Sequence, residues 1–232
     1  MELGKVDGIE LGDSLIERVF LGSDLVYLAQ DHSMVAGYSS TEFIVPEYVT
    51  EIHVTMVGGG GSGAVGSQHT DSGGGFAGEC VKFVMDVTPG ETIPLSVGVG
   101  GVGRSADSGY TLPGLPGEDT TFGTHTALGG AGGTENGTSY AGVGGTRTIC
   151  DVQEVDGTQS GASGEGKVAY GGQASRFRYG GNGDYSADDY AYGTNGAYGS
   201  GGGAANVEST AGTAYSGYGG DGAIFIEWGT KL

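Results

Sequence analysis

Tracts of consecutive glycines recur through most of the chain and constrain its fold more than any other feature. The longest are Gly58–Gly61, Gly73–Gly75, Gly201–Gly203 and the run 129–133, in which Ala131 interrupts four glycines. In all, 53 of 232 residues are glycine, against a usual share of ~7%. Ordering a glycine costs roughly 0.5–1 kcal/mol more than ordering an alanine. Either much of the chain is disordered, or the glycines have a structural use that offsets this cost.

Packing backbone against backbone would provide such a use. Glycine tracts can run as extended threefold helices of polyproline-II geometry. Without side chains, these strands can lie side by side and donate each N–H to a neighbouring carbonyl, which satisfies the backbone polar groups. Nine of the 13 tyrosines lie between Tyr140 and Tyr218, among the tracts, which favours this interpretation over disorder.

The glycine tracts are flanked by segments with the two-residue period of half-buried β-strands. Ile52, Val54 and Met56 alternate with polar residues, and the chain ends in the strand-like run 223–228. We expect two further one-sided faces and list them here: Val81, Phe83, Met85 and Val87 on the first, and Ile93, Leu95, Val97 and Val99 on the second. Between these two faces, Pro89 and Gly90 suit the central positions of a type II turn. We expect the last strand to return beside an early one.

Residues 1–30 differ in composition from the rest. Short apolar runs there are separated by Gly12-Asp13-Ser14 and Gly22-Ser23-Asp24, which are turn residues between strands. The sequence therefore predicts an all-β protein. A small N-terminal β-meander (1–30) is followed by a linker (31–40) and a glycine-rich β-sandwich (41–232) with polyglycine-II-like strands and long Gly/Tyr loops.

The charge balance excludes several classes of partner. The sequence contains 9 lysine and arginine residues and 28 aspartate and glutamate residues, which gives a formal net charge of −19. Phosphate binding needs clustered Lys or Arg, so we expect no nucleic-acid partner. The acidic surface is either simply solvated or favours cationic and carbohydrate partners. We see no signal peptide and no apolar run long enough to span a membrane.

The motifs of cofactor, metal and enzyme sites are weak. Gly58-x-Gly60-x-x-Gly63 matches the dinucleotide fingerprint in letters, but no helix can follow it, so we expect no cofactor. The four histidines are scattered and no nucleophile or acid/base set is visible, so we expect neither a metal centre nor an enzyme. Asp184, Asp188 and Asp189 form either a solvated acidic loop or a cation site. Cys80 and Cys150 could form a bridge, but we favour buried free thiols.

The segment from Tyr179 to Tyr198 is the strongest candidate for a binding site. It combines tyrosines with Gly, Ser, Asn and Asp, a composition that antibody binding loops also use because tyrosine gives rigid contact area at low entropy cost. Alternatively, the rings cover the glycine lattice as apolar cladding. The candidate receptor-binding residues are Tyr179, Tyr185, Asp188, Asp189, Tyr190, Tyr192 and Tyr198.

Several segments, in order, resemble the glycine-rich domain of tailed-phage virion proteins. The opening run 43–61 has an aromatic, a Val-Pro, and a strand that ends in a glycine run. Gly74–Glu79, Val87–Thr92, Val97–Gly101 and the closing run 219–228 follow in the same order. The resemblance covers about residues 41–229. Such domains occur in tail-fibre and tail-tip adhesins, in some of which a polyglycine-II lattice carries loops that contact the bacterial receptor.

The resemblance implies a virion structural protein of the tail fibre or tail tip that binds a host-surface carbohydrate or outer-surface protein. Residues 1–30 would dock to other virion proteins. The protein would be a homo-oligomer or would be bound to an oligomeric fibre. The protein would be assembled in the host cytoplasm and located on the virion. The alternative is a structural or decoration protein of tail or capsid without a receptor role. A secreted silk-like protein is disfavoured by the well-formed strands.

Overall fold

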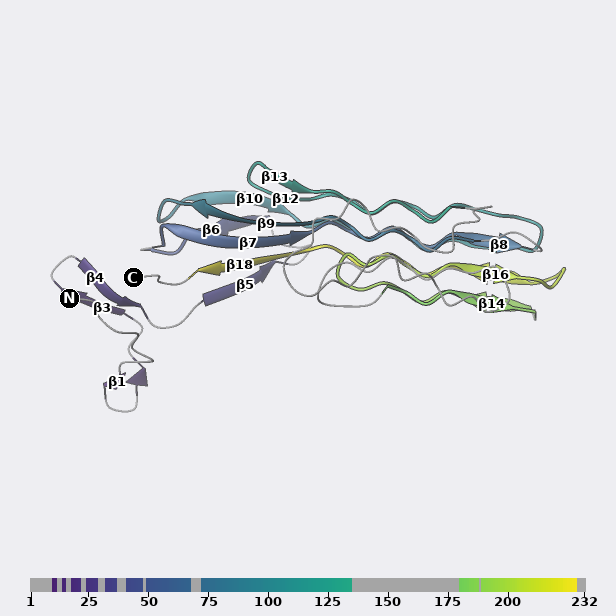
Figure 1. The fold of residues 1–232 in the computed structure, drawn as a ribbon, viewed down its shortest axis with the longest axis horizontal. Helices are drawn as coiled ribbons and strands as arrows, with labels where there is room; N and C mark the ends of the chain where they lie inside the picture. Colours follow the sequence, from purple (N-terminus) through teal and green to yellow (C-terminus); the bar gives the residue numbers. More distant parts are fainter. Residues whose placement is uncertain are drawn as a thin grey trace.

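The computed structural model is an elongated all-β molecule, which confirms the predicted fold class (Figure 1). The structure describes residues 10–11, 14–15, 18–21, 24–28, 32–36, 41–47, 49–67, 72–134, 180–187 and 189–228, with the backbone alone before residue 41. Within these ranges no helix occurs.

Two four-stranded antiparallel sheets form a sandwich at one end of the elongated domain. The first sheet has the order β5 (His32–Ala36), β18 (Ala223–Trp228), β7 (Glu51–Val57) and β9 (Cys80–Asp86). The second has the order β13 (His125–Ala127), β12 (Thr120–Phe122), β10 (Thr92–Ser96) and β6 (Glu42–Ile44). Ile226 lies opposite Val54 in the antiparallel β18–β7 pair, so the last strand does return beside an early one.

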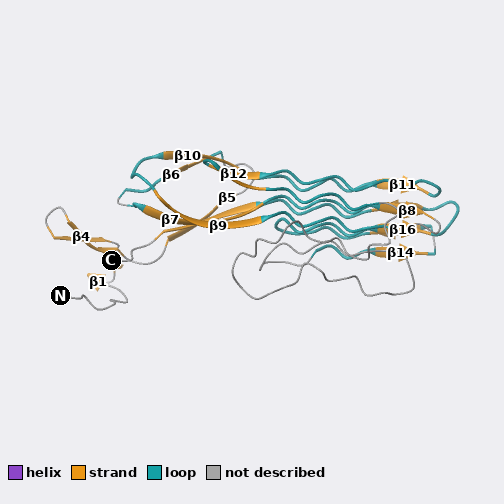
Figure 2. Cartoon of the chain, turned by 45° about the horizontal axis from the view of Figure 1, so that its top comes forward, coloured by secondary structure: helices purple, strands orange, loops and turns teal. Residues whose placement is uncertain are grey.

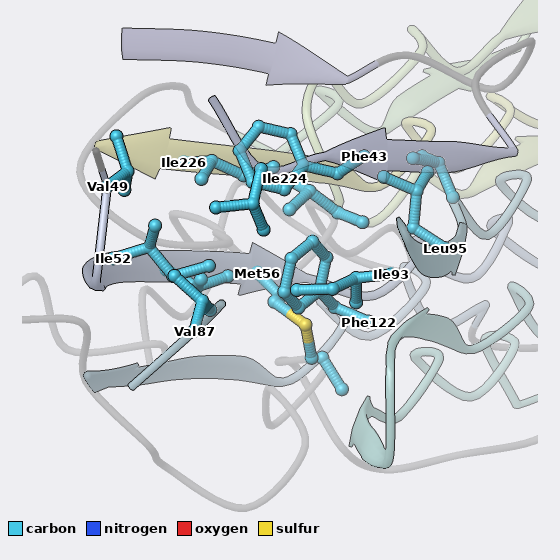
Figure 3. Packing of buried hydrophobic residues seen from close by; sticks show 14 residues of the cluster. Phe43, Val49, Ile52, Met56, Val87, Ile93, Leu95, Phe122, Ile224 and Ile226 are labelled. Atoms are coloured by element: carbon cyan, nitrogen blue, oxygen red, sulfur yellow. The ribbon is translucent and has the colours of Figure 1, made fainter. Parts of the chain in front are cut away.

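Side chains from both sheets fill one shared core (Figure 3). Ile52, Val54 and Met56 of β7 are all fully buried, as their alternation predicts. Phe43 of the second sheet reaches Trp228 of the first, with ring centroids 5.6 Å apart. The predicted turn is also present, because Glu91 N donates to Thr88 O at 2.9 Å and Gly90 has φ of +80°.

The period of burial changes where the second sheet ends. Ile93, Leu95 and Val97 are buried in alternation, but Val99 is exposed, so the expectation that it continues the buried face is wrong. Beyond β10 the chain leaves the pleated strand and enters a conformation in which every third residue faces water. Ser96, Val99 and Val102 are the exposed positions of this new repeat.

Residues 58–64 form the centre of the glycine lattice. Their N–H groups donate to three different neighbouring segments in rotation, and the rotation repeats every three residues. The acceptors, from Gly58 to Gly63 in order, are the carbonyls of Glu79, Glu118, Gly220, Phe76, Leu115 and Gly217. This repeat is the threefold backbone geometry expected for the tracts, and it confirms that the glycines are used in packing.

Three further segments donate to the carbonyls of the same central strand. Gly130 donates to Gly59, Gly101 to Gly60 and Gly202 to Gly61, each at 2.8–2.9 Å. The central strand thus has six neighbours. Each neighbour is also bonded to the next one around, for example Phe76 N to Ala131 O and Gly220 N to Ser200 O, both at 2.8 Å. The segments therefore pack as a closed hexagon of backbone strands around residues 58–64.

Glycine is required here for space. A Cβ at Gly61 would lie 2.0 Å from Ala131 O, and one at Gly75 would lie 2.0 Å from Gly61 O. Neither residue is among the glycines with positive φ, which are Gly90, Gly109, Gly123 and Gly199 within the described residues. Any side chain at these inner positions would therefore push two backbones apart.

Outer strands of the lattice carry a side chain at every third position. Tyr215, Tyr218 and Asp221 are exposed, whereas the residues between them are buried. Outer N–H groups that face no neighbouring carbonyl donate their hydrogen bonds to side chains instead. Asp221 Oδ1 accepts from Gly100 N at 2.9 Å, and Asp119 Oδ1 accepts from Gly129 N at 2.7 Å. Several acidic residues therefore complete the lattice hydrogen bonding.

At the far end of the lattice, short strands form two three-stranded sheets (Figure 2). One has the order β14 (Asp184–Ser186), β16 (Ala205–Val207) and β8 (Val65–Ser67), and the other β11 (Ser105–Asp107), β17 (Thr213–Tyr215) and β15 (Tyr190–Tyr192). The β14–β16, β16–β8 and β15–β17 pairs are parallel. Their small core consists of Val65, Ala106, Ala191, Ala205, Val207 and Ala214.

The described N-terminal strands form two separate two-stranded hairpins instead of the one continuous meander that we expected. Strands β1 (Glu10–Leu11) and β2 (Ser14–Leu15) pair, as do β3 (Arg18–Leu21) and β4 (Asp24–Leu28). Within the predicted linker 31–40, β5 instead pairs with β18 and adds an edge strand to the sandwich. Strands β3 and β4 lie at the end of the molecule opposite the distal sheets (Figure 1).

Candidate receptor-binding surface

The structure separates the seven predicted site residues. Tyr179 and Asp188 lie outside the described residues. Tyr185 is in β14, while Tyr190 and Tyr192 are in β15 and Asp189 immediately precedes that strand, so these four share the distal end. They occupy strands of the distal sheets and the turn between them, in place of the long Gly/Tyr loop that we expected over this stretch.

Tyr198 lies at the opposite end of the lattice. It has a φ of +44° in the turn before Gly199, whose N–H donates to Asp221 O. It lies six residues beyond Tyr192 along an extended segment, which is roughly 19 Å at ~3.1 Å per residue. Tyr198 therefore belongs to the sandwich side of the lattice, away from Tyr190 and Tyr192. It lies beside the segment that carries Tyr218, because a Cβ at Gly220 would be 2.8 Å from Tyr198 N.

Four exposed tyrosines line one flank of the distal end, and we name them the tyrosine face: Tyr190, Tyr192, Tyr215 and Tyr218. Tyr192 and Tyr215 lie opposite each other in the β15–β17 pair and stack with centroids 5.1 Å apart and an interplanar angle of 6°. Tyr190 stacks on Tyr192 at 6.3 Å and 20°. The exposed fractions are 57% for Tyr190, 56% for Tyr192, 38% for Tyr215 and 50% for Tyr218.

Tyr218 lies across the glycine lattice. A Cβ built at Gly103 would lie 3.0 Å and 3.1 Å from two carbons of the Tyr218 ring, so the ring covers this glycine. The backbone N–H of Tyr218 donates to Asn195 Oδ1 at 3.0 Å. The ring therefore acts as cladding while half of its surface remains in water, and both interpretations of the tyrosines apply to it.

Turns between the distal strands form the end surface of the molecule, and we name residues 108–111, 187, 189 and 208–212 the distal turns. Ser108 N donates to Gly212 O at 2.7 Å, and Thr213 N donates to Asp189 O at 2.8 Å. Ser209 Oγ donates to Asp189 Oδ1 at 2.9 Å. Tyr110 projects from these turns with 71% of its surface exposed. The turns are thus bonded to one another, which holds their exposed side chains in fixed positions.

Tyr185 is tied to the distal turns through Glu208. Its hydroxyl donates to Glu208 Oε2. The hydrogen bond to Glu208 raises the pKa of Tyr185 above its ordinary value of 10.0, and burial and the negative charge of Glu208 raise it further. This predicted site residue therefore has a structural partner of its own.

Acidic groups at the distal end are engaged in protein hydrogen bonds. Asp184 Oδ2 accepts from Tyr192 N at 2.7 Å, and Asp107 Oδ1 accepts from Thr213 Oγ1 at 2.9 Å. No group of three or more His, Cys, Asp or Glu side chains that could hold a metal occurs within the described ranges. The Gly58–Gly63 fingerprint forms the lattice centre, where its residues donate to neighbouring strands.

Cys80 corrects the expectation of two free thiols, because it is disulfide-bonded. It is buried at the start of β9 and packs with Val57 and Ala77 between the sandwich and the lattice. Cys150, the second cysteine of the sequence, lies outside the described residues. No helix long and apolar enough to cross a membrane is found in the described part of the chain.

The period of three, the lattice and the flanking sandwich define a glycine-rich structural domain. A family model described as a glycine-rich domain matches residues 36–231, and the chain belongs to that family. No curated protein matches the chain. Our sequence reasoning missed Tyr110, Tyr215 and Tyr218 as candidates. The three-residue spacing from Tyr215 to Tyr218 and Asp221 could have indicated the second and third, because it marks outward positions.

Proposed function

We propose that this protein is a phage virion structural protein of the tail fibre or tail tip, and that its distal end binds a host-cell surface receptor. The observation that carries the proposal is the division of the domain into a sandwich, a lattice and an exposed distal end. The lattice lies between the N-terminal hairpins and the distal sheets (Figure 2). The distal turns and Tyr190, Tyr192 and Tyr215 of the tyrosine face belong to these distal sheets and their connections.

Rigidity supports this role for the lattice. Each N–H from Gly58 to Ala64 donates to a neighbouring strand, at distances of 2.8–3.1 Å. Bending such a bundle would break bonds in several strands at once, and each buried group left unpaired costs roughly 1–3 kcal/mol. A receptor-binding protein that must hold its contact surface away from a particle needs a stiff spacer of this kind.

The disulfide at Cys80 fits a location outside the cell. Disulfides persist in oxidising surroundings such as virion surfaces and are rare in the cytosol. Because the protein would be assembled in the host cytoplasm, the bond would form on release of the particle.

The N-terminal end would attach the domain to the virion. Residues 1–30 would bind other virion proteins, with the chain present as a homo-oligomer or on an oligomeric fibre. Particles assembled in the presence of a chain truncated by residues 1–30 should not contain that chain, although the truncated domain remains folded. Normal incorporation of the truncated chain would exclude this docking role.

Adsorption of particles to host cells tests the receptor role. In the variant Tyr110→Arg/Thr210→Arg, bulky charges replace two exposed side chains of the distal turns, and we expect adsorption to fall more than tenfold. Ala131→Arg is the matched control, because Ala131 is an exposed position on the lattice flank. If particles carry the distal variant at normal copy number and adsorb normally, the alternative of a structural or decoration protein without a receptor role is favoured.

A further inference from the structure

We propose that the tyrosine face binds a neutral glycan chain laid along the lattice axis. The biological setting of this inference rests on the proposed receptor role, but the binding itself is a property of the isolated protein. The two proposals can therefore fail separately.

The arrangement of the rings is the first argument. Two adjacent strands place Tyr190, Tyr192 and Tyr215 in one stacked group, with Tyr218 three residues further along the same outer strand. In the extended threefold geometry, three residues span roughly 9 Å. The four rings thus extend along two neighbouring strands, with one step across the β15–β17 pair. Such an elongated surface suits an extended regular polymer better than a compact ligand.

The chemistry of the rings favours a sugar. Tyr218 rests on Gly103 with one side, which leaves ring surface open to water. The face of an aromatic ring carries the negative part of its quadrupole, and the C–H groups on one side of a pyranose ring are weakly positive. The exposed tyrosines offer large, rigid contact area of the kind found in binding loops.

Polar acceptors beside the rings favour the same ligand. Asp184 is bonded to the backbone of Tyr192, Asp107 to Thr213 beside Tyr190, and Asn195 to the backbone of Tyr218. A carboxylate has about four lone-pair sites, so Asp184 and Asp107 can each accept a further hydrogen bond from a sugar hydroxyl. These groups can fix the orientation of a polyhydroxylated chain.

Charge selects a neutral chain over an anionic one. From residue 41 onward, Lys82 and Arg104 are the lysine and arginine residues of the described part. Lys82 lies in β9, whereas Arg104 borders the face, because its backbone is hydrogen-bonded to Ser216 between Tyr215 and Tyr218. Asp107 and Asp184 border the face, in a protein of formal net charge −19. Anionic polysaccharides and phosphorylated lipids would be repelled at this surface.

Cladding alone does not explain why tyrosine occupies these positions. Equivalent outward positions on other lattice strands carry Val99, Leu128 and Thr134. A lattice strand therefore remains covered with smaller side chains, and the gathering of four exposed aromatic rings on one flank is a separate feature of the sequence.

A printed array of neutral and acidic oligosaccharides, probed with the full-length protein, tests the inference. We expect binding to neutral oligomers and none to their uronic-acid counterparts. In calorimetric titration with the best neutral oligomer, Tyr192→Ala/Tyr215→Ala should weaken binding more than tenfold. Tyr192→Phe/Tyr215→Phe should retain most of it, because the stacked rings remain. Leu128→Ala, on another lattice strand, should bind as the unaltered protein does.

A second measurement needs no variant and covers the case in which the alanine pair fails to fold. With ring-labelled tyrosine, the bound oligomer should shift NMR signals of Tyr192, Tyr215 and Tyr218 but not those of Tyr110. Absence of binding to every neutral oligomer would overturn the inference, as would shifts confined to Tyr110. Neither result would alter the adsorption test of the distal turns.

Discussion

Gly60 and Ser200 approach so closely that a Cβ on Gly60 would lie 2.1 Å from the carbonyl oxygen of Ser200. The two residues belong to distant parts of the sequence, and both are buried. Gly220 bridges them, because Gly60 N donates to Gly220 O and Gly220 N donates to Ser200 O, both at 2.8 Å. This approach is possible only without a side chain, and it sets the spacing of the lattice.

Gly60→Ala should therefore destabilise the protein by about 3 kcal/mol, the upper end of the usual range for overpacked sites. Gly109→Ala is the matched control, because a Cβ there meets no atom within 4 Å and only its φ of +90° is unfavourable. That control should cost about 1–2 kcal/mol. Urea unfolding measures both, and equal losses would contradict the role assigned to close strand packing.

The sequence predicts the sandwich well and the neighbours within the lattice poorly, for a physical reason. In the sandwich, apolar residues such as Ile52 and Val54 alternate with polar ones, which predicts the buried face of the strand. Burial of that face then fixes the strand register. In the lattice, the bonded groups are backbone N–H and C=O, which are the same in every tract. The sequence of Gly58–Gly61 therefore does not predict that its carbonyl groups accept hydrogen bonds from Gly101, Gly130 and Gly202.

The candidate site shows the same limit. Composition draws attention to Tyr190 and Tyr192, but it groups them with Tyr198, which lies toward the other end of the lattice. The partner that stacks on Tyr192 is Tyr215, which only the parallel pairing of β15 with β17 brings alongside. Long-range pairing between short strands has no local signal in the sequence.

Thr120 connects the sandwich to the lattice through two buried hydrogen bonds. Its Oγ1 donates to Val57 O at 2.8 Å and accepts from Gly98 N at 3.0 Å. Thr120→Val keeps the shape and leaves both groups unpaired, so we expect a loss of about 2–4 kcal/mol at roughly 1–3 kcal/mol per unsatisfied group. The exposed Thr126→Val should change the free energy of unfolding little. Equal effects in calorimetry would count against this junction.

The Asp221 carboxylate accepts a hydrogen bond from the N–H of Gly100, on the outside of the lattice. Asp221→Ala removes the acceptor and should cost about 1 kcal/mol, with faster amide exchange at Gly100. Asp221→Asn retains a carbonyl oxygen at the same position and should restore most of the protection. If both variants exchange alike, the role of this carboxylate is its charge and not its lone pair.

Cys80 should yield no free thiol in the unfolded protein until a reductant is added. Thiol titration in denaturant measures this directly, and two thiols should appear after reduction because the sequence has two cysteines. Removing a native disulfide typically costs 2–5 kcal/mol, so we expect Cys80→Ser to lower the free energy of unfolding by about that amount. Two thiols before reduction would show that the bond does not form.

The pair Tyr185 and Glu208 predicts a loss of stability at alkaline pH. Glu208 raises the folded-state pKa of Tyr185 above the ordinary value of 10.0. The stabilising contribution is therefore fully present below pH 10 and is lost as the pH rises through the folded-state pKa, where the hydroxyl no longer donates. The difference in unfolding free energy between the natural protein and Tyr185→Phe should be constant up to pH 9 and shrink above 10. Tyr110→Phe controls for the loss of one hydroxyl, and a Tyr185→Phe difference that does not change with pH would mean that the bond to Glu208 adds nothing.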